Sequence, residues 1–158
     1  MSANGMLVPE EAHTVPALPP QDINGGVQSV WWRMTTYARA AVVVGFGTTA
    51  AAPTAIRVQA AADDTGTDAE DIGFAYYPEE TAGADTPGPR ATADATGLTP
   101  AGTDDIFYVL DIDARDLPDG KPWLSVAIDA GADSIMAHVT AVLTGPRYAG
   151  RDQPSVLT

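Results

Sequence analysis

Apolar and polar residues alternate along several short stretches of this chain, the pattern of β-strands that bury one face. The clearest stretches are 106–113 and 123–129. Their apolar positions that share a face are Ile106, Tyr108, Leu110 and Ile112 in the first, and Leu124, Val126 and Ile128 in the second. Between them, residues 116–120 read Asp-Leu-Pro-Asp-Gly. This predicts a turn, because proline presets φ and glycine accepts positive φ.

Residues 134–144 admit two interpretations. A helix capped by Asp133 or Ser134 would place Ile135, Val139 and Val142 on one stripe. A strand would place five alternating apolar residues on one face. We favour the strand because the alternation is unbroken and β-branched residues are frequent. The five residues are Ile135, Ala137, Val139, Ala141 and Leu143.

The first half of the chain contains weaker strand patterns. They lie at 27–34, 39–46, 54–60 and 72–77. The turn-like residues 47–53 predict a hairpin between the second and third of these. Short strands separated by turns indicate an all-β fold, an antiparallel β-sandwich or jelly roll.

The composition divides the chain into parts. Residues 1–26 contain four prolines and predict an extended N-terminal arm. The sandwich is expected over 27–148, with a long Ala/Thr/Pro-rich loop insertion at 78–104 and a C-terminal tail at 149–158. The insertion has leucine as its one large aliphatic residue, so we expect it to be exposed.

Charge and cysteine content exclude several classes of function. The net charge of −13 argues against nucleic-acid and anionic-membrane binding, because both need a basic surface. The absence of cysteine removes disulfides and thiolate chemistry. No leader or apolar span is recognisable, and we expect a soluble protein. The acidity indicates a solvated surface, with adaptation to high salt or a basic partner as open alternatives.

Candidate chemistry is sparse. Asp64, Thr65 and Gly66 match the aspartic-protease triplet, but they follow a polar run where that triplet needs a buried strand. His13 and His138 are the two histidines, and neither has the spacing of a metal or triad partner. We therefore predict that the protein is not an enzyme and has no cofactor.

Three clustered carboxylates raise the question of calcium. Asp111, Asp113 and Asp116 lie close in sequence but lack the glycine and glutamate of an EF-hand loop. We expect Asp111 and Asp113 on the solvent face of a strand, with a weak, non-standard calcium site as the alternative.

Two adjacent tryptophans, Trp31 and Trp32, should point to opposite faces of a strand, one into the core and one outward. An outward tryptophan favours a protein contact over a sugar-stacking platform, for which Trp123 is the third candidate.

Three stretches resemble small structural proteins encoded among the head genes of tailed bacteriophages. They are Asp-Ile-Asn-Gly-Gly-Val-Gln-Ser-Val-Trp-Trp at 22–32, Ile-Arg-Val-Gln-Ala-Ala-Ala-Asp-Asp-Thr-Gly-Thr-Asp-Ala at 56–69, and Tyr-Val-Leu-Asp-Ile-Asp-Ala-Arg-Asp-Leu at 108–117, which continues to 141–149. Residues 78–104 depart from the pattern.

The resemblance implies a virion component assembled in the host cytoplasm, in particular a capsid decoration or cement protein. Its partners would be the major capsid protein or other virion subunits, and a homotrimer is the favoured oligomer. A neck or tail protein is the alternative within this class, and a secreted carbohydrate-binding or adhesive module is the alternative outside it. The residues expected at the protein interface are Leu7, Val8, Val15, Leu18, Trp31, Trp32, Pro146, Arg147 and Tyr148.

Overall fold

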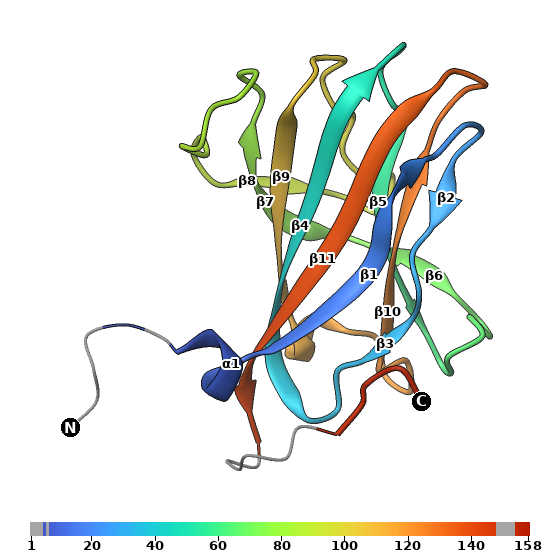
Figure 1. Ribbon diagram of the computed structural model, residues 1–158. Coiled ribbons are helices and arrows are strands. Elements are labelled where there is room, and N and C mark those ends of the chain that lie inside the picture. The colour runs from blue at the N-terminus through green and yellow to red at the C-terminus, as the bar shows by residue number, and fades with distance from the viewer. Residues whose placement is uncertain (1–4, 6, 148–153) are drawn as a thin grey trace.

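The computed structural model describes residues 5, 7–147 and 154–158, and it is built almost entirely from antiparallel strands (Figure 1). Two sheets pack face to face, which confirms the all-β sandwich. Helical structure among the described residues is limited to α1 (Val8–Glu11) and the 3-10 turn η1 (Ala114–Asp116). Neither has the length and apolar character that a membrane crossing requires.

The larger sheet has six strands and the smaller has five. The strands of the larger sheet, in spatial order, are β1 (His13–Asp22), β11 (Ile135–Pro146), β4 (Tyr37–Thr49), β9 (Ile106–Asp113), β7 (Phe74–Glu79) and β8 (Ala91–Ala93). The smaller sheet runs β2 (Val27–Gln28), β10 (Trp123–Asp129), β5 (Ala55–Ala61) and β6 (Glu70–Ile72), with β3 (Trp32–Arg33) also paired to β10.

The connectivity is that of a jelly roll. Its main strand pairs are nested: β1 pairs with β11, β2 with β10, β4 with β9, and β5 with β6. Such nesting arises when one long antiparallel ribbon folds over into two facing sheets. Strands β7 and β8 extend the larger sheet beyond this framework.

The core lies between the sheets, and the period of two along each strand fills it. One row of the larger sheet that faces inward runs across five strands, and the registers place its members side by side. The row is Val15, Ala141, Val42, Leu110 and Tyr76. The smaller sheet contributes Leu124, Val126 and Ile128 to the core. All three are fully buried, as the sequence pattern predicted.

The predicted extended arm over 1–26 is wrong for residues 13–22. These residues form β1 at the edge of the larger sheet, hydrogen-bonded to β11. The three prolines in this strand, Pro16, Pro19 and Pro20, are exposed, where the missing N–H is tolerated. Proline content therefore does not distinguish an extended arm from an edge strand, which accommodates proline equally well.

Two other strand predictions need correction. The expected hairpin does not form, because β4 belongs to the larger sheet and β5 to the smaller one. The strand expected at 27–34 is broken into β2 and β3, which both pair with β10. At the break, Ser29 donates its N–H to the Val126 carbonyl and accepts the Val126 N–H on its hydroxyl, at 2.8 and 2.9 Å.

The insertion at 78–104 is exposed over much of its length but is held to the sandwich. It contributes β8, and Leu98 is buried while exchanging two backbone hydrogen bonds with Ile56. Gly97 has a φ of +87°, and a Cβ there would lie 2.3 Å from the Ile56 carbonyl oxygen, so only glycine fits. The C-terminal segment is not a free tail either, since Val156 is buried in the core.

Tyr108 ties this insertion to the core. Its hydroxyl donates to Glu80 at 2.7 Å and accepts the Ala101 N–H at 2.8 Å. Burial, reinforced by the bond to Glu80, raises the pKa of Tyr108 well above its ordinary value.

Candidate protein-interaction surface

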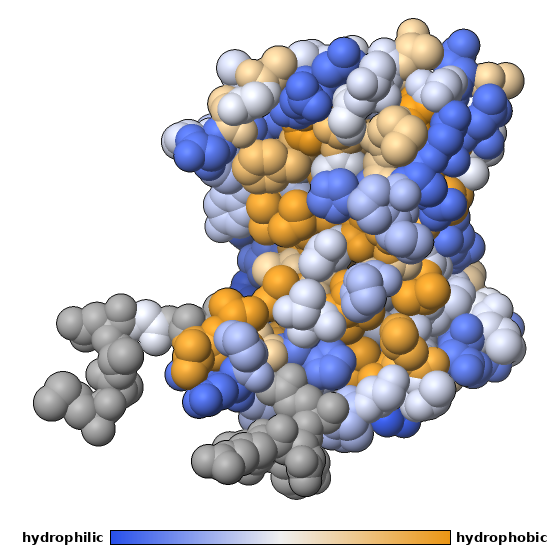
Figure 2. Space-filling model, in the orientation of Figure 1, coloured by the Kyte–Doolittle hydropathy of each residue, from blue (hydrophilic) through white to orange (hydrophobic). Residues whose placement is uncertain are grey.

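The outer face of the larger sheet carries an apolar band. The registers align Thr140 of β11, Val43 of β4, Val109 of β9 and Tyr77 of β7 in one row, all half-buried. Figure 2, which views this sheet from outside, shows apolar surface gathered over these strands. No other described element packs over the row, so its apolar atoms are partly open to solvent.

Further apolar side chains widen this band. Phe107 and Val142 flank the row and are half-buried, and Met136 is 39% exposed. We call the surface formed by Val43, Tyr77, Phe107, Val109, Met136 and Val142 the apolar face. It carries large aliphatic and aromatic groups on positions that, in an antiparallel sheet facing water, are usually polar.

His138 lies within the apolar face and is half-buried. It stands opposite Gly45 of β4, and a Cβ on Gly45 would lie 2.2 Å from its Nε2 atom. The glycine thus leaves room for the imidazole to lie flat across the neighbouring strand. This keeps the surface smooth where a side chain at position 45 would interrupt it.

Ion pairs occupy one end of the larger sheet. Arg39 makes a bidentate contact with Asp111, with its Nη2 2.6 Å from Oδ2, and Arg115 contacts Asp113 at 2.8 Å. The hydrogen bond from the Arg115 guanidinium, with that from its N–H, holds the pKa of Asp113 well below its usual range. Both carboxylates therefore have arginine partners.

The arrangement of these carboxylates can be compared with what the calcium site suggested by the sequence would require. Among the described residues there is no group of three or more acidic or histidine side chains that is placed to hold a metal ion. Asp111 and Asp113 lie on the outward side of β9, as expected for a solvent-facing strand.

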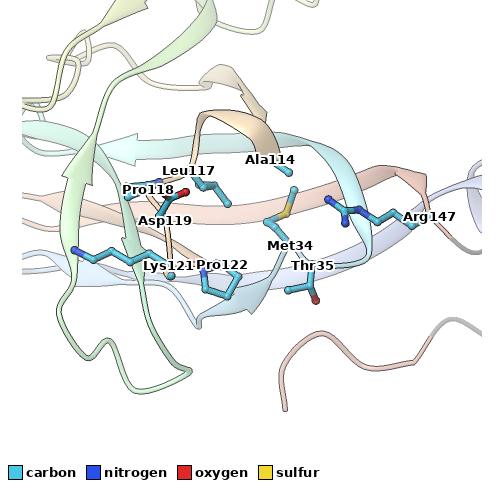
Figure 3. Close-up of a pocket in the computed structure, with 10 residues that line it drawn as sticks. Met34, Thr35, Ala114, Leu117, Pro118, Asp119, Lys121, Pro122 and Arg147 are labelled. Atoms are coloured by element: carbon cyan, nitrogen blue, oxygen red, sulfur yellow. The ribbon is translucent and has the colours of Figure 1, made fainter.

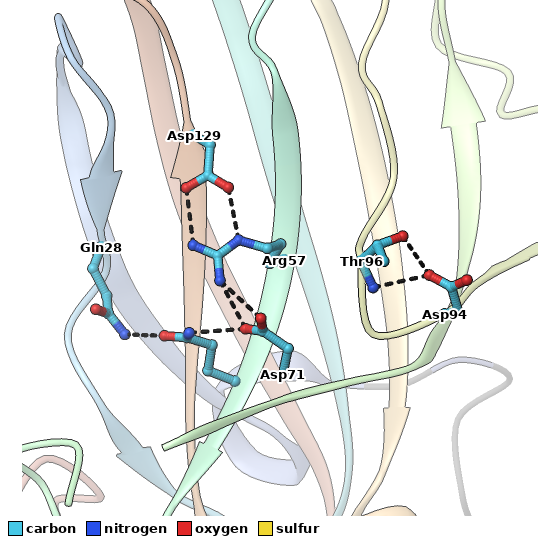
Figure 4. Close-up of polar contacts among 7 residues, drawn as sticks. Gln28, Arg57, Asp71, Asp94, Thr96 and Asp129 are labelled. Atoms are coloured by element: carbon cyan, nitrogen blue, oxygen red, sulfur yellow. Dashed lines mark hydrogen bonds and ion pairs between the residues drawn. The ribbon is translucent and has the colours of Figure 1, made fainter. Parts of the chain in front are cut away.

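The outer face of the smaller sheet is different, because charged and amide side chains bond to one another across it (Figure 4). Arg57 of β5 contacts Asp129 of β10 at 2.7 Å and Asp71 of β6 at 2.8 Å. Gln59 bridges Asp71 and Gln28 of β2. The two carboxylates, Asp129 foremost, raise the pKa of Arg57. We call these five residues the polar network.

The tryptophans are less exposed than the sequence suggested. Trp32 and Trp123 are buried. Trp31 is half-buried, and its indole would lie 3.0 Å from a Cβ on Gly66. Arg33 stacks over Trp123, with its Cζ 5.8 Å from the ring centroid. None of the three therefore presents a free ring for stacking against a sugar.

The predicted interface residues are only partly at the surface. Val15, Leu18 and Trp32 are buried in the core, so the prediction is wrong for them, because β1 and β3 are sheet strands. Leu7 and Val8 are exposed by 53% and 38% at α1. The other members of the set fall as follows: Trp31 and Pro146 are half-buried, Arg147 is exposed, and Tyr148 lies outside the described residues.

The apolar face was missed, although the sequence carried a signal for it. Val42, Val43 and Val44 are consecutive, and Phe107 and Val109 alternate with the buried set of β9. Apolar residues at both parities of a strand indicate that both of its faces avoid water.

Two of the residues considered for catalysis, Asp64 and His13, lie in a loop and against an aromatic ring, respectively. Asp64 is exposed in a loop whose shape is set by its neighbour Asp63, which accepts the N–H groups of Thr65 and Thr67, both at 3.0 Å. The His13 ring packs 5.8 Å from that of Tyr37.

A hollow opens at the end of the sandwich where the 34–35 and 116–122 loops meet Arg147 (Figure 3). Its volume is about 400 Å³. Its lining combines Met34, Leu117 and two prolines with a few charged side chains. This mixture of apolar walls and few polar groups is typical of binding pockets.

No known protein family, curated protein or solved structure matches this chain.

Proposed function

We propose that the protein is a structural subunit that docks through its apolar face onto a larger protein assembly. The observation that carries this proposal is the row formed by Thr140, Val43, Val109 and Tyr77, an apolar strip that no other described element packs over. Burying such a strip against a partner gains about 25 cal/mol per Å² of apolar area removed from water.

The assembly proposed is the virion of a tailed bacteriophage, with the protein acting as a capsid decoration or cement protein. Two features support this. The three sequence stretches resemble such proteins, and jelly rolls are widely used in viral capsid subunits. Because one fold serves many functions, the fold alone would not carry the proposal. The partner would be the major capsid protein, and a trimer at a threefold position would multiply modest contacts.

The alternatives make different demands. A neck or tail protein would use the same kind of surface at a much lower copy number. A carbohydrate-binding module would need an exposed aromatic platform, and the buried Trp32 and Trp123 and the half-buried Trp31 do not supply one. Catalysis would need reactive groups gathered at a pocket, and none of His13, His138 and Asp64 lines the hollow of Figure 3.

Quantitative mass spectrometry of purified particles, with copies counted against the major capsid protein, tests the assignment. A copy number comparable to that of the capsid protein is the expected result. A number close to that of a single vertex or tail would replace decoration by the neck or tail role. Complete absence from the particles would contradict the virion proposal.

A further inference from the structure

The hollow beside Met34 combines an apolar floor with two cations, Lys121, which is paired with Glu70, and Arg147. Met34 is 1% exposed and forms part of the lining with Leu117, Pro118 and Pro122. Figure 3 shows the Arg147 side chain extending toward Met34 from the opposite wall. The arginine is exposed, so a partner can reach it.

Arg147 differs from most of the other cations of this acidic protein. Arg39, Arg57 and Arg115 each contact a carboxylate, and Lys121 contacts Glu70. Arg147 has no carboxylate partner within the described residues. In a chain with a net charge of −13, an unpaired arginine beside an apolar hollow marks a place where an outside carboxylate would be stabilised.

The walls of the hollow are held in place before any ligand arrives. The Arg147 N–H donates to the Thr36 carbonyl at 2.8 Å, and the Met34 N–H donates to the Pro122 carbonyl at 2.9 Å. Lys121, whose side chain points away from Arg147 in Figure 3, is fixed by its 2.5 Å contact with Glu70. A site fixed in this way loses little conformational entropy on binding.

The two ends of the hollow also differ in charge. Asp119 lines the side away from Arg147 (Figure 3). A carboxylate would be attracted to the Arg147 end and repelled at the Asp119 end. A ligand should therefore place its negative group at one end only and its apolar group over Met34.

We infer that this hollow binds an extended peptide segment of a partner protein in which an apolar side chain lies next to an acidic one. The apolar side chain would pack between Pro118, Pro122 and Met34, and the carboxylate would pair with Arg147. Arginine in a partly desolvated pocket is a frequent energetic centre of protein interfaces. The inference holds for any partner and does not depend on the phage assignment.

The test uses the full chain labelled with ¹³C at its methionine methyl groups. The probe is a short peptide with blocked ends, in which leucine and proline precede a glutamate. Met34 reports on the hollow, while Met136 reports on the apolar face of the larger sheet. We expect the Met34 signal to shift with a millimolar dissociation constant and the Met136 signal to stay in place.

Three comparisons make the result specific. Arg147→Gln should weaken the peptide about tenfold, because a charge-assisted pair is lost. Arg90→Gln removes another exposed arginine that has no carboxylate partner among the described residues, and it should leave binding unchanged. A glutamine version of the peptide should behave like the Arg147 variant.

Several outcomes would overturn the inference. They are an unmoved Met34 signal, equal binding of the glutamate and glutamine peptides, equal effects of the two arginine substitutions, or butyrate shifting Met34 as strongly as the peptide does. None of these outcomes bears on the apolar face, so the failure of this inference and the failure of the proposed function are distinguishable.

Discussion

The two outer faces of the sandwich solve the problem of facing water in opposite ways. On the smaller sheet, Arg57 binds Asp71 and Asp129, so strands β5, β6 and β10 are linked by side chains that water also solvates well. On the larger sheet, Val43 and Val109 stand side by side between Thr140 and Tyr77, and no ion pair among the described residues covers them. The polar groups on the smaller sheet find their partners within the chain, whereas the larger sheet leaves apolar area that a partner protein could cover.

This contrast directs the search for a functional surface to the larger sheet. A strand face that stays in water gains from polar groups, so an apolar one needs another explanation. The side chains of the polar network bond to one another, so this face needs no partner protein to satisfy them. The side chains of the apolar face make no such bonds with one another, and we therefore propose that a partner docks there.

The largest expected effect separates the two sides of a single strand. Leu110 and Val109 are neighbours on β9, the first fully buried and the second half-buried on the apolar face. Leu110→Ala should lower the free energy of unfolding by about 2–5 kcal/mol, because it leaves a cavity in the core. Val109→Ala should cost below about 1 kcal/mol.

Urea unfolding followed by circular dichroism checks this pair. If the two alanine variants lost similar stability, Val109 would be a core residue and the apolar face would not be a surface. If Val109→Ala left stability intact, particle binding by the same variant would measure its role in docking.

The next effect tests the polar network. Arg57→Gln leaves Asp71 and Asp129 without their cation, and the Arg57 side chain is only 26% exposed. We expect a loss of about 1–2 kcal/mol in the free energy of unfolding. Arg39→Gln is the matched control, since Arg39 contacts one carboxylate and its side chain is 51% exposed, and it should cost less.

Chemical denaturation of both glutamine variants, at low and at high salt, gives the comparison. Equal losses would show that the network is no more than a set of surface ion pairs. A loss for Arg57→Gln that persists in high salt would support the view that the smaller sheet depends on these bonds.

The smallest expected effect is the loss of stability at low pH. The Thr96 hydroxyl and N–H groups bond to the Asp94 carboxylate and lower its pKa, and Arg115 does the same for Asp113. A lowered pKa in the folded state means that these carboxylates stabilise the fold at neutral pH. That contribution is present above the unfolded pKa of about 4 and is lost as the pH falls toward the folded value.

Thermal unfolding between about pH 6 and about pH 3 tests the sign. The melting temperature should fall below about pH 4. Asp94→Asn should make that fall shallower, whereas Val109→Ala should shift the whole curve without changing its slope. A profile for Asp94→Asn that parallels the wild type would contradict the role given to the Thr96 contact.

Much of the fold could be predicted from the sequence, for a physical reason. Strand 106–113 buries every second residue, so its sequence carries the period of two directly. Strand 123–129 is buried at almost every position, and its alternation of large and small residues still marked it as a strand. The jelly-roll pairing could not be read in the same way, because strand partners such as β1 and β11 lie far apart in the chain. Nothing local distinguishes a proline-rich edge strand from an arm.

The candidate surface was harder to predict than the fold. Of the predicted interface residues, Leu7, Val8 and Arg147 are exposed, because they lie outside the regular strands or at their ends. Val15, Leu18 and Trp32 were misplaced, because an apolar residue looks the same in sequence whether it faces a partner or the core. Only the sheet assigns its direction, and that assignment also revealed Val43 and Val109 as outward residues.

Binding of the purified protein to particles that lack it, measured by co-sedimentation for two lysine substitutions, tests the docking claim most directly. Val43→Lys places a charge in the apolar face, and Gln28→Lys places the same charge on an exposed position of the polar network. The account predicts that Val43→Lys abolishes co-sedimentation while Gln28→Lys retains it, with both variants folded by circular dichroism. Undiminished binding of Val43→Lys, or equal loss in both variants, would contradict it.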